Sequence, residues 1–241
     1  MTLVARLRAA GCVFAEDEAR LLSESPEFSE ALVQRRLDGE PLEYVLGWAS
    51  FAGRRFVIEP GVFIPRHRTE FLVETAIAEA PDDPVILDVC CGTGALGLTV
   101  HAAVGGTLVA ADIDPAAVRC AEANGARAFV GDLFDPVPAA LHGSVDILIA
   151  NTPYVPTAAI AFLPREFRDH EDARTLDGGG DGLALQRRVA AAASTWLAPE
   201  GRVYLEASSE QAPLSAALFA SAGLRATVVT DDDATIIVAT R

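Results

Sequence analysis

The chain has 241 residues, of which 51% are hydrophobic and 22% are charged, enough for one large domain or one domain with an appendage. Its formal net charge of −15 argues against binding to bare nucleic acid, whose phosphate backbone would repel it. No apolar run reaches about 18 residues, and the N-terminus does not resemble a signal peptide. The sequence therefore predicts a cytoplasmic protein with no membrane partner.

Three short helices are expected within residues 1–40. The first ends at Gly11, the second covers 15–23, and the third covers 27–37 with Ser25 as its N-cap. The segment 48–51 and the segment 55–59 then predict a β-hairpin, and residues 69–80 predict another helix.

From Pro84 onward the chain alternates apolar strands with alanine-rich helices. Such an alternation indicates a doubly wound, mostly parallel sheet. The last two strands are separated by only four residues, too few for a helical crossover, so they should pair antiparallel. A seven-stranded sheet of this kind is typical of class I methyltransferases. The expected strands are 85–89, 107–111, 128–130, 145–150, 202–206, 226–230 and 235–240.

A glycine-rich loop follows the first of these strands. It reads Gly92-x-Gly94-x-x-Gly97, and Asp112, twenty residues after Gly92, stands where an acid for ribose hydroxyls belongs. This motif alone fits NAD and S-adenosylmethionine equally well. We therefore expect a nucleotide-type cofactor at this loop, with Cys90 among the residues that line it.

Further strand ends favour S-adenosylmethionine. Asp88 lies before the glycines, where it can orient the amino acid moiety of the ligand, and Ile113 follows Asp112. Asp132 and Leu133 end the third strand and are expected to contact the adenine, although Asp132 also fits a simple turn acid. The carboxyl ends of parallel strands converge at one edge of the sheet, so these residues should share one crevice.

The segment Asn151-Thr152-Pro153-Tyr154 follows the fourth strand. The side-chain oxygen of Asn151 and the main-chain oxygen of Thr152 can each accept one hydrogen from a planar NH2 group, and the ring of Tyr154 can pack on its face. Pro153 restricts Thr152 to an extended conformation that presents its carbonyl. The tetrapeptide therefore predicts an N-methyltransferase, the alternative being a plain turn before proline.

No metal site is expected. The four cysteines form no CxxC pair and have no histidine cluster beside them, so they are predicted to be free thiols. They are Cys12, Cys90, Cys91 and Cys120.

Several separated segments resemble the protein-(glutamine-N5) methyltransferase family, the HemK/PrmC group, over nearly the whole chain. They are Gly39 to Gly47, Phe63-Ile-Pro-Arg66-His-Arg-Thr69-Glu70, Asn151 to Tyr154, Arg165 to Glu171 and Leu176 to Leu183. The resemblance implies a helical substrate-docking domain over 1–46, a β-hairpin linker over 47–68 and a methyltransferase domain over 69–241.

The resemblance also implies an activity. It would be methylation of a protein glutamine amide, in the best-known members the Gly-Gly-Gln of peptide chain release factors. Asn151 and Thr152 would bind the amide, and Tyr154 would pack against it. Asp88 and Asp112 would hold the cofactor, together with Gly92 and Asp132. Methylation of another planar nitrogen, in a small amide or adenine, and a non-catalytic cofactor-binding module are the alternatives.

The chain departs from the family pattern at four places. Thr152 replaces the first proline of Asn-Pro-Pro-Tyr, and Cys90-Cys91 stands where Gly-Thr is common. His67-Arg68 replaces proline followed by an acid, and the N-terminal region is shorter.

Overall fold

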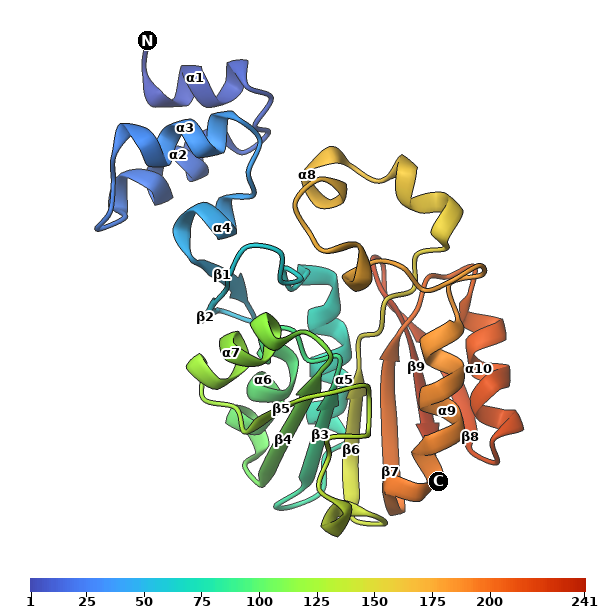
Figure 1. Cartoon of the computed structure of the whole chain (residues 1–241). Helices are drawn as coiled ribbons and strands as arrows, with labels where there is room; N and C mark the ends of the chain where they lie inside the picture. Colours follow the sequence, from blue (N-terminus) through green and yellow to red (C-terminus); the bar gives the residue numbers. More distant parts are fainter.

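The computed structural model describes residues 1–241, in which an N-terminal helical unit, a small hairpin and a large α/β unit follow one another (Figure 1). None of the helices combines the length and the apolar composition needed to cross a membrane. The helices and strands before the large sheet are α1 (Leu3–Ala9), α2 (Ala15–Glu24), α3 (Glu30–Leu37), α4 (Leu42–Leu46), β1 (Trp48–Phe51), β2 (Arg54–Val57) and α5 (Glu70–Ala78). Those of the sheet region are β3 (Val85–Val89), α6 (Ala95–Val104), β4 (Thr107–Asp112), α7 (Pro115–Ala123), β5 (Ala128–Val130), β6 (Val145–Ala150), α8 (Arg165–Arg168), α9 (Ala184–Trp196), β7 (Leu197–Glu206), α10 (Ala212–Ser221), β8 (Arg225–Thr230) and β9 (Thr235–Thr240).

The start of α3 differs from the prediction. The helix begins at Glu30, and its N-cap is Ser29, whose hydroxyl accepts a hydrogen bond from Leu32 N at 3.2 Å. Ser25 instead belongs to a turn, in which its carbonyl accepts from Phe28 N at 3.0 Å. Two serines compete for one cap, and the later one is used because the intervening residues form this turn.

The N-terminal helices have a small core of their own, separate from the sheet. Leu7 and Leu22 are completely buried in it, and Val45 of α4 also belongs to it. Glu18 of α2 and Arg36 of α3 form a buried ion pair beside this core, with Arg36 Nε 2.6 Å from Glu18 Oε2. The unit is thus stabilised both by apolar burial and by one buried charge pair.

The large sheet has the strand order β5-β4-β3-β6-β7-β9-β8. Its pairs are parallel except for β7–β9 and β8–β9, which confirms the predicted antiparallel end of a mostly parallel sheet. β7 begins at Leu197, five residues earlier than predicted, because its first residues pair with Val145 across a register shift in β6.

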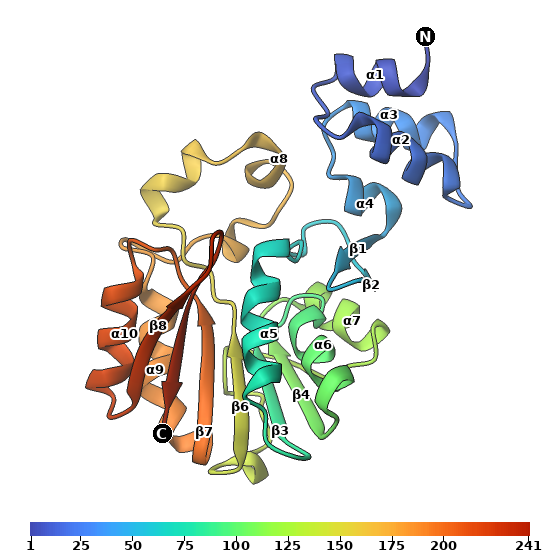
Figure 2. The same cartoon turned by 180° about the vertical axis from the view of Figure 1, so that it is seen from behind.

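Both faces of the central strands are covered, as their sequences require. Ile147 of β6 packs in the cluster formed with α5, α6 and α7, whereas Leu148 packs on the opposite face with α9 and α10. Figure 2 shows the first of these helix layers in front of the sheet. Strands buried on both faces read as continuous apolar runs, which is why the sequence indicated them clearly.

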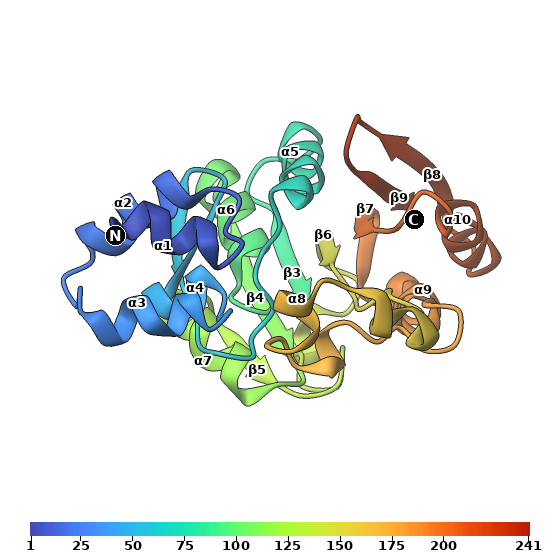
Figure 3. The same cartoon turned by 90° about the horizontal axis from the view of Figure 1, so that it is seen from above.

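A long irregular segment, residues 155–176, crosses above the carboxyl ends of the strands, and we call it the strap. It contains η3 (Thr157–Phe162), α8 and η4 (Ala173–Thr175). Its two ends meet, because Val155 N donates to Leu176 O at 3.0 Å and Gly178 N donates to Val155 O at 2.8 Å. Seen from above, the strap covers the upper ends of the strands, and the N-terminal helices lie to one side (Figure 3).

Candidate active site

A cavity of about 470 Å³ opens at the carboxyl ends of β3, β4 and β6, beneath the strap and beside the segment 62–68. Nine of the residues predicted for the site line it, so the strand ends converge as expected. They are Asp88, Cys90, Gly92, Asp112, Ile113, Asn151, Thr152, Pro153 and Tyr154.

The glycine-rich loop is held close to β3 by its last glycine. Gly97 N donates to Asp88 Oδ2 at 2.9 Å. A Cβ atom on Gly97 would lie 2.9 Å from that same oxygen and 2.8 Å from Leu108 Cδ1, so only glycine fits. Gly94 has φ +75° and serves as the N-cap of α6, outside the cavity wall. Its place in the predicted cofactor site stays a prediction.

Asp112 organises the second strand end. Its Oδ2 accepts from Gly92 N at 2.8 Å, and its Oδ1 accepts from Asp114 N at 2.9 Å. Asp114 caps α7 by accepting from Ala116 N. Asp112 therefore ties the glycine loop to the next strand and still carries lone pairs toward the cavity.

Burial controls the protonation of this wall. It raises the pKa of Asp88 to about 7. The hydrogen bond from Gly97 N lowers this pKa, but by less than burial raises it. Burial also raises the pKa of Asp112 and of the Cys90 thiol, which remains neutral. A cationic ligand in the cavity would reverse this effect on the two carboxyl groups.

The structure does not bring Asp132 and Leu133 to the cavity wall. Asp132 forms an ion pair with Arg188 of α9, at 2.9 Å, and Leu133 is buried in the core beneath. The chain turns inward after β5 at this point, and Leu133 adopts φ +50°. Contacts from either residue to an adenine stay predictions.

The polar atoms of the Asn151-Thr152 segment are free. No hydrogen bond within the protein uses the side-chain oxygen of Asn151 or the carbonyl oxygen of Thr152. Thr152 is only 1% exposed, and its hydroxyl oxygen is also without a partner. Thr152 is buried, and a buried carbonyl oxygen without a partner in a cavity wall is typical of a place where a ligand supplies the donor. Asn151 is half-buried and lines the same cavity.

Tyr154 is fixed by two residues that sequence reasoning missed. Its hydroxyl accepts from Arg68 Nη2 at 2.7 Å and donates to Glu206 Oε1 at 2.8 Å. Burial and the charge of Glu206 raise the pKa of Tyr154 to about 12, so the phenol is neutral. Glu206 ends β7, and this position at a strand end was the available signal. Arg68 lies in the short 3-10 helix η1 (His67–Thr69), and only the folded chain brings it beside Tyr154.

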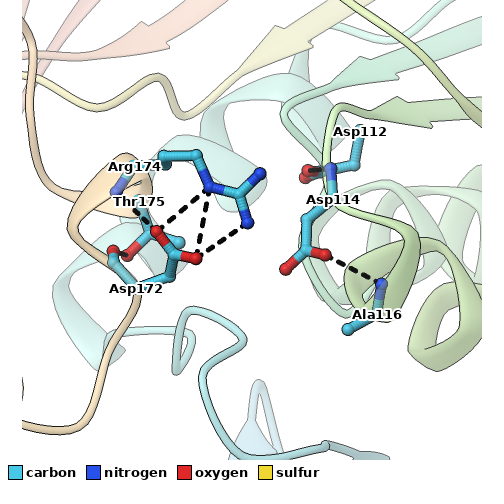
Figure 4. A network of polar contacts seen from close by, with 6 residues as sticks. All are labelled: Asp112, Asp114, Ala116, Asp172, Arg174 and Thr175. Carbon is cyan, nitrogen blue, oxygen red and sulfur yellow. Dashed lines mark hydrogen bonds and ion pairs between the residues drawn. The ribbon is translucent and has the colours of Figure 1, made fainter.

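On the strap side, Arg174 faces the acidic wall across the cavity. It forms an ion pair with Asp172 at 2.7 Å, and Figure 4 shows its side chain reaching toward Asp112 and Asp114. All four residues line the cavity, and the hydrogen bonds of Arg174 all go to Asp172, none to Asp112 or Asp114. The strap thus places one guanidinium opposite Asp112, which holds the glycine loop, and Asp114, which caps α7.

Two ion pairs hold the strap in place. Arg66 Nη2 lies 2.5 Å from Glu171 Oε1, and its guanidinium carbon lies 3.9 Å from the centre of the Phe167 ring. Arg36 of the N-terminal helices reaches Glu166 of α8 at 3.2 Å. The strap is therefore linked both to the segment before α5 and to the N-terminal unit.

Comparison with known proteins identifies the family to which the chain belongs. A family model described as "Methyltransferase small domain" matches residues 53–181. The release factor glutamine methyltransferase of Geobacter sulfurreducens is 38% identical over 199 residues, which are 80% of this chain and 69% of that protein. That of Mycolicibacterium smegmatis is 39% identical over 184 residues, 73% of this chain and 65% of that protein.

A third relative has a different name. It is the 4-amino-L-phenylalanine/4-methylamino-L-phenylalanine methyltransferase of Streptomyces pristinaespiralis, 35% identical over 203 residues, 79% of this chain and 69% of that protein.

Solved structures agree on the fold. The Mtq2–Trm112 complex of E. cuniculi is matched with a TM-score of 0.53 at 19% identity, over 75% of this chain and 98% of that one. The T. thermophilus methyltransferase RsmC is matched with a TM-score of 0.55 at 21% identity, over 80% of this chain and 49% of that one. The extent and identity of the sequence matches are decisive: the chain belongs to the release factor glutamine methyltransferase family.

Proposed function

We propose that this protein transfers a methyl group from S-adenosylmethionine to the side-chain amide of a protein glutamine, in the Gly-Gly-Gln segment of a peptide chain release factor. One observation carries the chemistry. Two unpaired acceptors, the side-chain oxygen of Asn151 and the carbonyl oxygen of Thr152, stand together at the end of β6, in a cavity that Tyr154 also lines. A primary amide supplies the two donors that they lack. The names of the relatives support the release factor as substrate.

The cavity suits the cofactor in size and in charge. Asp112 offers lone pairs for ribose hydroxyls, and Asp88 is a buried carboxyl beside the loop that would surround the amino acid moiety. Asp88, Cys90, Gly92, Asp112 and Ile113 are the residues proposed to hold it. The cofactor supplies a methyl group on a positively charged sulfur.

The protein contributes position and electrostatics. An amide nitrogen is a weak nucleophile, because its lone pair is delocalised into the carbonyl. Holding it in line with the methyl group lowers the barrier by roughly 7–11 kcal/mol in ideal cases. As positive charge develops on nitrogen, its hydrogen bonds to Asn151 and Thr152 strengthen, which stabilises the transition state more than the ground state. The carbon–sulfur bond would break as the carbon–nitrogen bond forms, its electron pair would stay on sulfur as a neutral thioether, and the methylated nitrogen would release one proton to solvent.

The division of the chain follows from this function. We propose that residues 1–46 dock the protein substrate, that residues 47–68 link them to the catalytic unit, and that residues 69–241 carry out methyl transfer. The separate core of the N-terminal helices supports this division.

A second candidate is methylation of an aromatic amine. It is favoured by the 35% identity to the 4-amino-L-phenylalanine methyltransferase, and an arylamine NH2 could meet the same two acceptors.

The deciding experiment incubates the purified protein with S-adenosylmethionine and either a release factor or 4-amino-L-phenylalanine. Intact-mass spectrometry and peptide mapping then locate the methyl group. One methyl on the glutamine of Gly-Gly-Gln supports the proposal. Methylation of the amino acid alone supports the second candidate, and transfer to neither rejects both.

Replacing Asn151 by alanine tests the two acceptors directly. We expect turnover to fall by about 10²–10³, the usual effect of removing one group that stabilises developing charge. The dissociation constant for S-adenosylmethionine, measured by calorimetry, should change less than about twofold, because the other contacts remain. Normal turnover in this variant would contradict the assigned role.

A further inference from the structure

Arg68 has an unusual place in the cavity wall. It lies in the segment before α5, lines the same cavity as Asn151 and Thr152, and its side chain remains 46% exposed.

The guanidinium group is held on two of its three nitrogens. Nε donates to Glu206 Oε1 at 3.0 Å, and Nη2 donates to the hydroxyl of Tyr154 at 2.7 Å. The hydroxyl of Thr69 donates to the other oxygen of Glu206, which is only 3% exposed. Because both Glu206 oxygens are engaged, the plane of the guanidinium is fixed.

The third nitrogen, Nη1, has no hydrogen-bond partner in the protein. It is a free donor on a guanidinium that is held in place by Glu206 and Tyr154, in the wall of the cavity that Asn151 and Thr152 also line. Glu206 already balances the charge of Arg68, so this edge of the site is close to neutral. A neutral carbonyl oxygen suits such a donor better than a second carboxylate does.

We infer that Arg68 is a positioning residue that binds the carbonyl oxygen of the methyl-accepting amide and so selects primary amides over aromatic amines. The inference rests on the proposed function. An amide has an oxygen next to its NH2 group, and both ends are then matched: two acceptors for the nitrogen and one donor for the oxygen. An arylamine has no such oxygen and would leave Nη1 unpaired, which is how polar sites reject analogues.

The expected kinetic signature follows from the chemistry. As the amide nitrogen takes the methyl group, its carbonyl oxygen loses electron density, so a bond to that oxygen does not strengthen in the transition state. Arg68 therefore contributes to binding of the acceptor rather than to the chemical step. Its loss should raise the acceptor KM and leave kcat within about threefold.

Two variants test this without leaving a buried charge alone. Arg68→Lys keeps the partner of Glu206 but not the rigid three-nitrogen fork. The double variant Arg68→Met with Glu206→Gln removes both charges, and a glutamine oxygen can still accept from Tyr154. Arg202→Lys is the matched control, since Arg202 lies on the same strand as Glu206 and pairs with Glu79 at 2.8 Å, outside the cavity.

Release factor methylation, 4-amino-L-phenylalanine methylation and S-adenosylmethionine binding are measured for each variant. We expect the release factor KM to rise about tenfold or more in both test variants, while cofactor affinity stays within about twofold and Arg202→Lys matches the wild type. Where arylamine transfer is measurable, its kcat/KM should not fall, so the preference for the amide decreases about tenfold.

Three results would overturn the inference. They are an unchanged KM, an equal loss for both acceptors, and a weaker cofactor affinity that accounts for the whole change. Wild-type protein that fails to methylate the release factor rejects the proposed function, and the inference with it. If instead the wild-type protein is active and the variants have an unchanged release factor KM, the inference alone is rejected.

Discussion

The hydroxyl of Thr152 is buried without a hydrogen-bond partner, although its neighbours form the proposed acceptor site. An unsatisfied buried hydroxyl costs roughly 1–3 kcal/mol, and the proposed chemistry uses the carbonyl of this residue, not its side chain. The unpaired hydroxyl of Thr152 therefore lowers the free energy of unfolding and has no role in the proposed chemistry.

Thr152→Val should stabilise the protein. We expect the free energy of unfolding to rise by about 1 kcal/mol, which raises Tm by about 2–4 °C in a protein of this size, with turnover retained. Thr69→Val is the matched control, because Thr69 is equally buried but its hydroxyl is bonded to Glu206, so that variant should lose stability. Thermal unfolding of both distinguishes them, and a loss in Thr152→Val would show that its hydroxyl is satisfied in solution.

The elevated pKa of Asp88 makes stability depend on pH. The folded-state pKa is about 7 against 3.8 as the ordinary value, so the folded protein keeps a proton that the unfolded chain releases. The stabilising effect of this protonation is complete below about pH 4 and is lost as the pH rises toward 7. Relative to Asp88→Asn, the wild type should lose stability between pH 4 and 7 and show no further loss above. Urea unfolding of both proteins at several pH values measures the difference, and parallel curves would contradict it.

The residues of the site divide by what determines them. Asp88, Asp112 and Asn151 could be predicted because each directly follows a buried strand, and parallel topology brings strand ends together. Arg68 and Glu206 could not be paired in this way, since 138 residues separate them and no local pattern links them.

At the scale of single elements, length decided what could be predicted. The central strands β3, β4 and β6 were located because they are mainly apolar runs, whereas α4 was missed. It has five residues, begins after Pro41 and is capped by Gly47 with φ +76°. Proline and glycine so close together indicate a break, and nothing local shows that one helical turn fits between them.

The contact between α6 and β3 depends on Gly97, which leads to a further prediction. Gly97→Ala would push a methyl group against Asp88 and Leu108, so we expect a loss of about 1–3 kcal/mol in stability and weaker S-adenosylmethionine binding. In Gly180→Ala the new methyl group meets nothing within 4 Å, and this variant should behave as the wild type. Chemical denaturation and calorimetry measure both effects, and an unchanged Gly97→Ala protein would show that the helix can shift away from the strand.

At the scale of the whole molecule, Arg36 joins three parts of the chain. Its guanidinium pairs with Glu18 inside the N-terminal unit and with Glu166 in the strap, and it donates to the carbonyl of Glu40 at 3.1 Å. The helical unit and the cover of the cavity are thereby connected through one side chain.

Arg36→Met should destabilise the protein by about 3–5 kcal/mol, because Glu18 is left as a buried, unpaired charge. Adding Glu18→Gln should restore much of the loss. Arg20→Met removes an arginine from exposed pairs with Asp17 and Glu24 and should cost less than about 1 kcal/mol. Urea denaturation compares the three variants, and a loss in Arg36→Met as small as that of Arg20→Met would exclude a buried pair.

The position of β9 has a consequence for synthesis. β9 lies between β7 and β8 in the sheet, yet it follows both in the chain. While the ribosome is making the protein, β8 has no strand to pair with until residues 235–240 emerge. Until then β7 pairs only with β6, and its other edge has no hydrogen-bonding partner. Strands β3 to β7 can associate as they appear, at the usual pace of about 5–20 residues per second. The end of the sheet, however, closes in a single late step, and during that interval β7 presents an open edge to other nascent chains.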